Sequence, residues 1–199
     1  MTRRSPAIAV LVLLIGCFAA APREAAAQDP RAFVADLGHQ AIQVLGQNVS
    51  PAQRIARFRQ LFRDDFDVPG IGQFVLGRYW RVATPAEQQE FLQLFQEYIV
   101  QSYAARLGEY GGEQFRVISS RPAGNETVVT SEIDGPSSRV LVDWYLVDRG
   151  GRPRISDVYV GGISMKVTQR DEFASVIQRS GGRVDALLAQ LRQRLAAAR

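Results

Sequence analysis

The sequence predicts an α+β fold in which a helical layer packs on one face of a twisted, four-stranded antiparallel sheet. Apolar residues recur at helical spacing up to about residue 110, at alternate positions over residues 115–160, and at helical spacing again towards the C-terminus. Strands grouped between two groups of helices are typical of this class. No internal repeat or linker interrupts the pattern, so residues 28–199 are expected to form one domain.

Residues 1–27 have the composition of a cleavable export signal. A pair of arginines precedes an apolar stretch over residues 7–21, and small residues end at Ala27, where cleavage is expected. The stretch is shorter than the ~20 residues of a membrane span. Cys17 ends a Leu-Ile-Gly-Cys motif that also fits lipid attachment, so a lipoprotein is the alternative to a soluble exported protein.

Charge and cysteine content limit the function classes. The chain after residue 27 carries 21 basic and 19 acidic residues, and Lys166 is its only lysine. This balance argues against a nucleic-acid-binding surface. Because the single cysteine, Cys17, falls in the predicted signal, no disulfide is expected and packing must supply the stability.

Three helical segments are predicted ahead of the central helix. Asp29 and Pro30 introduce the first, Ser50 and Gln53 form a capping pattern for the second, and residues 68–80 contain the glycines and proline of a short, broken helix. The apolar stripes of the first two helices are Phe33, Leu37, Ile42 and Leu45, and Ile55, Phe58, Leu61 and Phe62.

The strongest helix start lies at Thr84. Its hydroxyl can accept from a free backbone N–H, Pro85 suits the first helical position, and Glu87 completes a capping box. The helix is predicted over residues 85–110 with an unusually aromatic apolar face. That face consists of Phe91, Phe95, Tyr98, Ile99, Tyr103 and Leu107.

Four strands are predicted after Gly112, because apolar and polar residues alternate between turn-forming segments. They cover residues 115–119, 127–133, 139–147 and 155–160. Short separators favour an antiparallel meander. The third strand presents a single apolar face made by Val140, Val142, Trp144 and Leu146. Helical spacing returns on both sides of a glycine pair at 181–182, which predicts two C-terminal helices.

Two segments carry a family resemblance. The first is GRYWRVATPAEQQEF, which begins at Gly77 and is followed by Tyr98 and Tyr103; the second is DVYVGGISM, residues 157–165, with TQRDEF shortly after it. Together they resemble the MlaC phospholipid-binding proteins, also called the toluene-tolerance family. The resemblance extends over about residues 33–195.

The resemblance implies a non-enzymatic, monomeric periplasmic carrier whose helical layer and sheet enclose a cavity for lipid tails. It implies exchange of phospholipid with an inner-membrane ABC complex bearing an MCE-type subunit and with an outer-membrane lipoprotein complex. Gly161 stands where the family usually has Glu, and Thr168 and Gln169 stand where many members have Asn and Tyr. The first departure removes a carboxylate that the family usually has. The second, with FDVP at residues 66–69 and the segment EFASVIQRSGG, is more similar to a branch associated with hopanoid biosynthesis, so a hopanoid is the alternative ligand.

A lipid carrier needs a deep apolar pocket, since shielding ~30 methylenes from water is worth on the order of 20 kcal/mol. The apolar residues that would line it could instead form a solid core. Arg78 and Arg81 are either solvated or close to a phosphate at the mouth. The expected lining is Phe74, Tyr79, Trp80, Phe91, Phe95, Tyr98, Ile99, Tyr103, Val140, Val142, Trp144, Val158, Val160 and Met165.

Enzyme chemistry has little support in the sequence. The only histidine, His39, has apolar neighbours, and no nucleophile elbow, phosphate loop or cysteine–histidine metal spacing is present. Asp64, Asp65 and Asp67 crowd a helix end, where a solvated turn is expected rather than a Ca²⁺ site. Neither a cofactor nor a metal is expected, and a small periplasmic hydrolase or isomerase is the weaker alternative.

Overall fold

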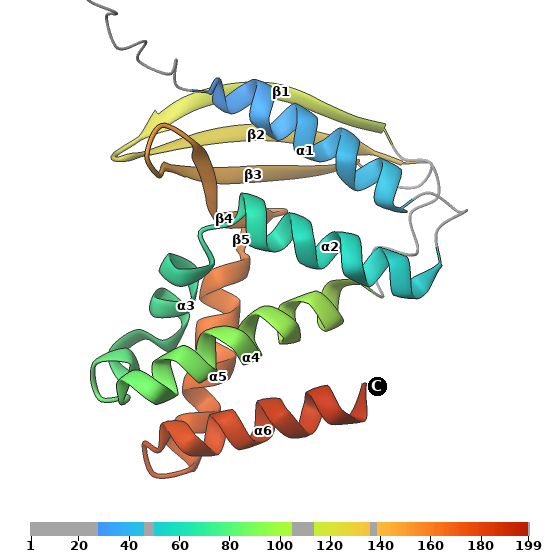
Figure 1. Cartoon of the computed structure of the whole chain (residues 1–199). Helices are drawn as coiled ribbons and strands as arrows, with labels where there is room; N and C mark the ends of the chain where they lie inside the picture. The colour runs from blue at the N-terminus through green and yellow to red at the C-terminus, as the bar shows by residue number, and fades with distance from the viewer. Residues whose placement is uncertain (1–27, 46–49, 105–113, 136–138, 199) are drawn as a thin grey trace, which may run out of the picture.

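A sheet and a layer of helices make up the fold, with the helices on one face of the sheet (Figure 1). The computed structural model describes residues 28–45, 50–104, 114–135 and 139–198. The predicted export signal, with Cys17, lies outside them. Among the described residues there are six α-helices, one 3-10 helix and five strands. No helix in this part of the chain is both long and apolar enough to cross a bilayer.

The N-terminal helices begin where the sequence predicts them. Ser50 accepts from the backbone N–H of Gln53, and the Gln53 side chain returns to the Ser50 backbone, so the predicted capping box is confirmed. The predicted break in residues 68–80 is also confirmed, because Gly77 has a φ of 57° and starts a 3-10 turn there. The elements are α1 (Pro30–Leu45), α2 (Pro51–Asp65), α3 (Val68–Leu76) and η1 (Gly77–Arg81).

The central and C-terminal helices form the rest of the helical layer. They are α4 (Pro85–Ala104), α5 (Met165–Arg179) and α6 (Val184–Ala197). The second predicted capping box is confirmed, with Glu87 N donating to Thr84 Oγ1 over 3.2 Å and Thr84 N to Glu87 Oε2 over 2.8 Å. The part of the predicted helix beyond residue 104 lies outside the described residues. A helical core forms where Phe91 and Phe95 of α4 meet Phe173 of α5 edge-on.

The sheet is an antiparallel meander in the order β1-β2-β3-β4-β5. Its strands are β1 (Gln114–Ala123), β2 (Glu126–Asp134), β3 (Arg139–Asp148), β4 (Pro153–Val160) and β5 (Ile163–Ser164). The predicted count of four strands is wrong by the two-residue β5. Gly161 and Gly162 both have positive φ, which allows a two-residue hairpin loop and pairs β5 with β4.

Helices cover one face of the sheet, as predicted. Phe33 and Leu37 of α1 pack with Val129, Leu146 and Ile155 of the sheet in a core of their own, separate from the helical core. Figure 1 shows α1 lying across the strands and α2 between the sheet and the other helices. The protein therefore has two apolar cores, one on each side of α2.

The two layers are joined at the α2–α3 turn (residues 66–67). Phe66 forms a parallel bridge with Ile155 of β4, and the backbone N–H of Asp67 donates to the Ile155 carbonyl over 2.8 Å. The Phe66 side chain packs against both cores. A backbone connection therefore fixes the position of the helical layer on the sheet.

Ion pairs reinforce the same junction. Asp67 accepts from the Gly70 backbone N–H at the start of α3 and lies 2.5 Å from Arg149 Nη2, and Asp65 lies 3.0 Å from Arg152 Nη2. The expectation of a solvated turn is wrong for both aspartates, because sequence proximity to one helix end did not reveal the arginines of the β3–β4 hairpin. Among the described residues no cluster of side chains is arranged to hold a metal ion.

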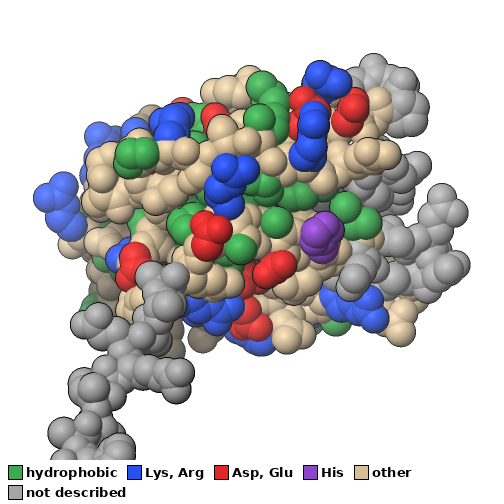
Figure 2. Space-filling view, turned by 90° about the horizontal axis from the view of Figure 1, so that it is seen from above, with side chains coloured by type: hydrophobic (Ala, Val, Ile, Leu, Met, Phe, Trp, Pro, Cys, Tyr) green, Lys and Arg blue, Asp and Glu red, His purple; other side chains and the backbone are tan. Residues whose placement is uncertain are grey.

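The surface mixes charges of both signs. Figure 2 shows Lys/Arg and Asp/Glu side chains interspersed on the face seen from above, with exposed His39 on α1 among them. No continuous basic stripe covers the part of this face that the structure describes. This distribution agrees with the near balance of charge in the sequence.

We predict that Asp67→Ala lowers the free energy of unfolding by about 1–2 kcal/mol, because it removes the cap of α3 and the partner of Arg149. Chemical denaturation would measure the loss. Asp64→Ala is the matched control, since its side chain is 42% exposed and pairs only with neighbouring Arg63. The control should cost less than about 0.5 kcal/mol. Equal losses would show that the junction does not depend on Asp67.

The pKa of Asp65 gives a second prediction. Burial raises the pKa of the Asp65 carboxyl above its ordinary value, and the positive charge of Arg152 only partly opposes this. Because the unfolded chain ionises at a lower pH than the folded one, stability is lost as pH rises from the ordinary carboxyl pKa to the raised folded-state pKa. Asp65→Asn should therefore gain stability relative to the wild type between about pH 3 and pH 7. Melting temperatures of both proteins across this range would test the direction of the change. A variant that loses stability relative to the wild type as pH rises would contradict the prediction.

Candidate functional site

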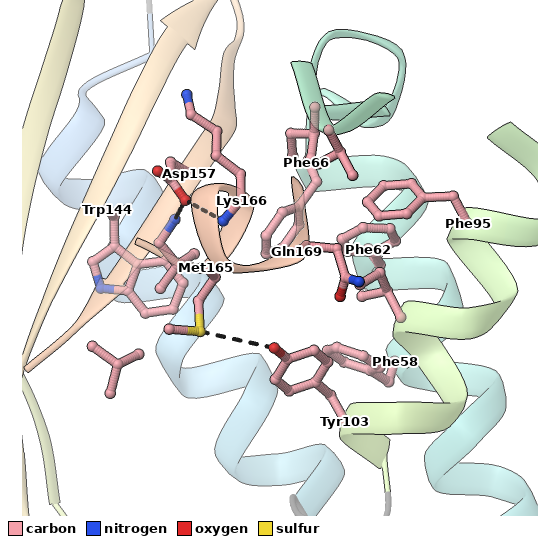
Figure 3. A pocket seen from close by; sticks show the side chains of 15 residues that line it. Phe58, Phe62, Phe66, Phe95, Tyr103, Trp144, Asp157, Met165, Lys166 and Gln169 are labelled. Carbon is pink, nitrogen blue, oxygen red and sulfur yellow. Dashed lines mark hydrogen bonds between the residues drawn. The ribbon is translucent and has the colours of Figure 1, made fainter. Parts of the chain in front are cut away.

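An apolar cavity of about 260 Å³ lies between the helical layer and the sheet. Helices α2, α3 and α4 form one wall, and β3, β4 and the start of α5 form the other (Figure 3). The lining residues are Phe58, Phe62, Phe66, Ile71, Val75, Phe95, Ile99, Tyr103, Trp144, Asp157, Val158, Val160, Met165, Lys166 and Gln169.

The helical wall is aromatic because α2 places phenylalanines four residues apart, on one helix face. The ring centroids of Phe58 and Phe62 are 6.4 Å apart, and those of Phe62 and Phe66 are 4.8 Å apart. Phe95 of α4 meets Phe62 edge-on at 6.4 Å, which connects this row to the helical core. The packed rings give the cavity a rigid apolar side.

The sheet wall is built around Trp144. Its indole Nε1 donates to the hydroxyl of Ser131 over 2.8 Å, and Ser131 is fully buried. Val158 lies opposite Trp144 in the β3–β4 register, and Phe115 meets the indole edge-on. The hydrogen bond fixes the plane of the ring, so Trp144 presents an apolar face to the cavity.

The polar groups of the lining are engaged with the protein. The Asp157 carboxylate accepts from Val158 N at 2.8 Å, from Lys166 N at 3.1 Å and from Ser164 Oγ at 2.5 Å. It thereby ties β4 to the start of α5. Because its oxygens are occupied by three donors, Asp157 supports the wall rather than acting as a free base.

Two further polar contacts involve the lining. Gln169 donates to Glu172 over 3.1 Å, and the Tyr103 hydroxyl lies 3.8 Å from Met165 Sδ. The second contact joins α4 to the start of α5 (Figure 3). The lining is therefore mainly apolar, and its side chains come from distant parts of the chain.

Half of the expected lining lies on this cavity. These seven residues are Phe95, Ile99, Tyr103, Trp144, Val158, Val160 and Met165. The structure places the other seven outside the lining. These are Phe74, Tyr79, Trp80, Phe91, Tyr98, Val140 and Val142.

The residues outside the lining are buried or half-buried elsewhere in the protein. Phe91 is fully buried against Phe173, and Tyr98 packs on Phe173 with its hydroxyl in contact with Arg194 and Glu172. The aromatic face of α4 therefore divides between the cavity and the helices α5 and α6. Arg78 donates to the Tyr79 hydroxyl over 2.8 Å, so this pair is internal to η1.

Sequence reasoning missed eight lining residues. Phe58 and Phe62 were assigned to an apolar stripe but not to a cavity, and their spacing with Phe66 was the available signal. The three polar residues of the lining had none, because their position depends on how β4 meets α5. The missed residues are Phe58, Phe62, Phe66, Ile71, Val75, Asp157, Lys166 and Gln169.

The family model described as MlaC protein matches residues 36–193. The chain belongs to the MlaC family. Among curated MlaC-related proteins, it is 30% identical over 122 residues to toluene tolerance protein ttg2D of Pseudomonas putida, covering 60% of this chain and 57% of that protein. It is 22% identical over 128 residues to the intermembrane phospholipid transport system binding protein MlaC of Haemophilus influenzae, covering 61% of this chain and 59% of that protein. These matches span less than two thirds of either relative.

A solved structure shares the MlaC-family fold. The phospholipid-binding protein from Ralstonia solanacearum, solved in complex with a phospholipid, aligns with a TM-score of 0.72 at 23% identity. The alignment covers 86% of this chain and 99% of that one. At this identity the similarity establishes the arrangement of helices and sheet.

We predict that Ser131→Ala lowers the free energy of unfolding by about 1–2 kcal/mol, because it removes the hydrogen-bond partner of the Trp144 indole in the cavity wall. Denaturation followed by tryptophan fluorescence would measure it. Ser120→Ala, on an exposed position of β1, is the matched control and should change stability by less than about 0.5 kcal/mol. A loss no larger than that of the control would show that the bond does not hold the wall.

Proposed function

We propose that this protein is a non-enzymatic lipid carrier that binds phospholipid acyl chains in the cavity between its helical layer and sheet. The observation that carries the proposal is the apolar lining, in which aromatic and aliphatic side chains from both layers face one space. Each methylene withdrawn from water contributes about 0.8 kcal/mol, so such a space favours hydrocarbon. The name of the Haemophilus influenzae relative, a phospholipid transport system binding protein, and the phospholipid bound to the Ralstonia solanacearum protein support the same ligand class.

The size of the cavity bears on how a lipid would be held. At about 260 Å³, the cavity lies just below the roughly 300–1,000 Å³ of pockets that enclose drug-sized ligands. A two-chain lipid therefore requires the cavity to widen. Any widening would have to occur around the junction of Phe66 with Ile155, because Phe66 packs against both cores.

Export and transfer complete the proposal. Residues 1–27 would direct the chain to the periplasm, where residues 28–199 would act as a soluble monomeric domain. The carrier would exchange lipid between an inner-membrane ABC complex with an MCE-type subunit and an outer-membrane lipoprotein complex. The family membership supports these partners, while the interspersed surface charges in Figure 2 give no reason to invoke nucleic acid.

A hopanoid is the second candidate ligand. Gln169, which stands where many family members have tyrosine, is buried and lines the cavity. An amide in place of a phenol changes the shape and polarity of the wall, so a different lipid could be selected there. A hydrolase or isomerase is less well supported, because Asp157 is held by three internal donors.

We predict that protein purified natively after expression from the full sequence contains about one phospholipid per chain, and that Ile99→Asp lowers this content at least tenfold. Ile99 lines the cavity, and an uncompensated carboxylate there disfavours hydrocarbon. Solvent extraction and mass spectrometry would identify and count the lipid. Ile118→Asp, at an exposed position of β1, is the matched control and should retain the lipid.

The same measurement separates the candidate functions. A wild-type protein that is empty after production in a phospholipid-rich host would contradict the phospholipid carrier. Co-purified hopanoid would favour the second ligand. Melting curves of both variants would show whether lipid loss reflects the added charge or a loss of folding.

A further inference from the structure

Lys166 is the one cation among the described residues that line the cavity. It follows Met165 at the start of α5, and its ammonium lies over Phe74, a residue outside the lining. Figure 3 shows the Lys166 side chain extending away from Tyr103 and Phe58, at the opposite side of the lining. Its stem contributes to the wall while its ammonium leaves the apolar space, as long basic side chains do at such boundaries.

A second cation reaches the same place. Arg170 lies one turn after Lys166 on α5, and both cations lie over the ring of Phe74, at 4.8 Å for Lys166 Nζ and 5.1 Å for Arg170 Cζ from the ring centroid. Like charges four residues apart on a helix repel each other. The first turn of α5 contains no acidic residue, and its N-terminus is itself positive. This rim, defined by Lys166, Arg170 and Phe74, therefore concentrates positive charge.

The neighbouring carboxylates do not neutralise this rim. Asp157 is buried and accepts from Ser164 and two backbone N–H groups, and Glu172 pairs with Arg194. Within the described ranges, neither rim cation has a carboxylate oxygen within 4.0 Å.

We infer that Lys166 and Arg170 bind a phosphate group at the rim, which, if the proposed function holds, is the headgroup phosphate of the bound lipid. The aromatic face of Phe74 holds both cations on one side through cation–π contacts and leaves other donors free. Lysine supplies a point charge to phosphate, and the guanidinium supplies parallel N–H donors. Acyl chains would lie in the cavity and the headgroup at the rim, where the Lys166 side chain leaves the lining. The site thus selects lipids that carry a phosphate.

The test compares two lipids with the same acyl chains, phosphatidylglycerol and diacylglycerol, on delipidated full-chain protein, by displacement of a fluorescent fatty acid. Lys166→Gln should weaken phosphatidylglycerol binding about tenfold and leave diacylglycerol binding within about twofold. Arg170→Gln should act in the same direction, and Lys166→Arg should retain the preference. Arg179→Gln, near the other end of α5, removes an equal charge and should have no effect.

The outcomes distinguish this inference from the proposed function. The phosphate site would be overturned if the wild type bound both lipids with equal affinity, or if Lys166→Gln lost the same affinity for both. The proposed lipid-carrier function would then still stand. Failure of the wild type to bind either lipid would overturn both. Inorganic phosphate would be added to the wild type loaded with either lipid. If it displaces phosphatidylglycerol but not diacylglycerol, the site also accepts free phosphate. If it displaces neither, the site is restricted to phosphate carried by a lipid.

Discussion

The junction between Phe66 and Ile155 is the contact on which the rest of the structure depends. Apolar burial has no preferred direction, so by itself it would press two apolar layers together until no space remained. A backbone hydrogen bond and neighbouring ion pairs are directional, and they fix how the α2–α3 turn sits on β4. The layers are thereby held in register while a cavity remains between them.

Helix α2 joins the two cores because its phenylalanines face more than one neighbour. Phe62 contacts the helical core through Phe95, and Phe66 packs against both the helical core and the core under α1. The same row of rings forms one wall of the cavity. A change in the packing of either core therefore acts directly on the shape of the site.

Polar groups are distributed according to their distance from the cavity. Inside, Asp157 and the indole of Trp144 have protein partners, which lowers the cost of placing polar atoms beside hydrocarbon. At the rim, Lys166 and Arg170 lie over the ring of Phe74. The acyl chains of an amphipathic ligand would match the apolar interior, and its negatively charged headgroup would match the cationic rim.

The sequence by itself determined the class of fold, both capping boxes and the meander, because each depends on residues close together in the chain. It also indicated which faces are apolar, but not what each face meets. On α4, Phe91 and Ile99 belong to one predicted stripe, yet Phe91 packs on α5 while Ile99 lines the cavity. Only the tertiary structure decided this, since a spacing pattern records that a side chain is buried, whereas the position of distant segments decides whether it meets another side chain or a cavity.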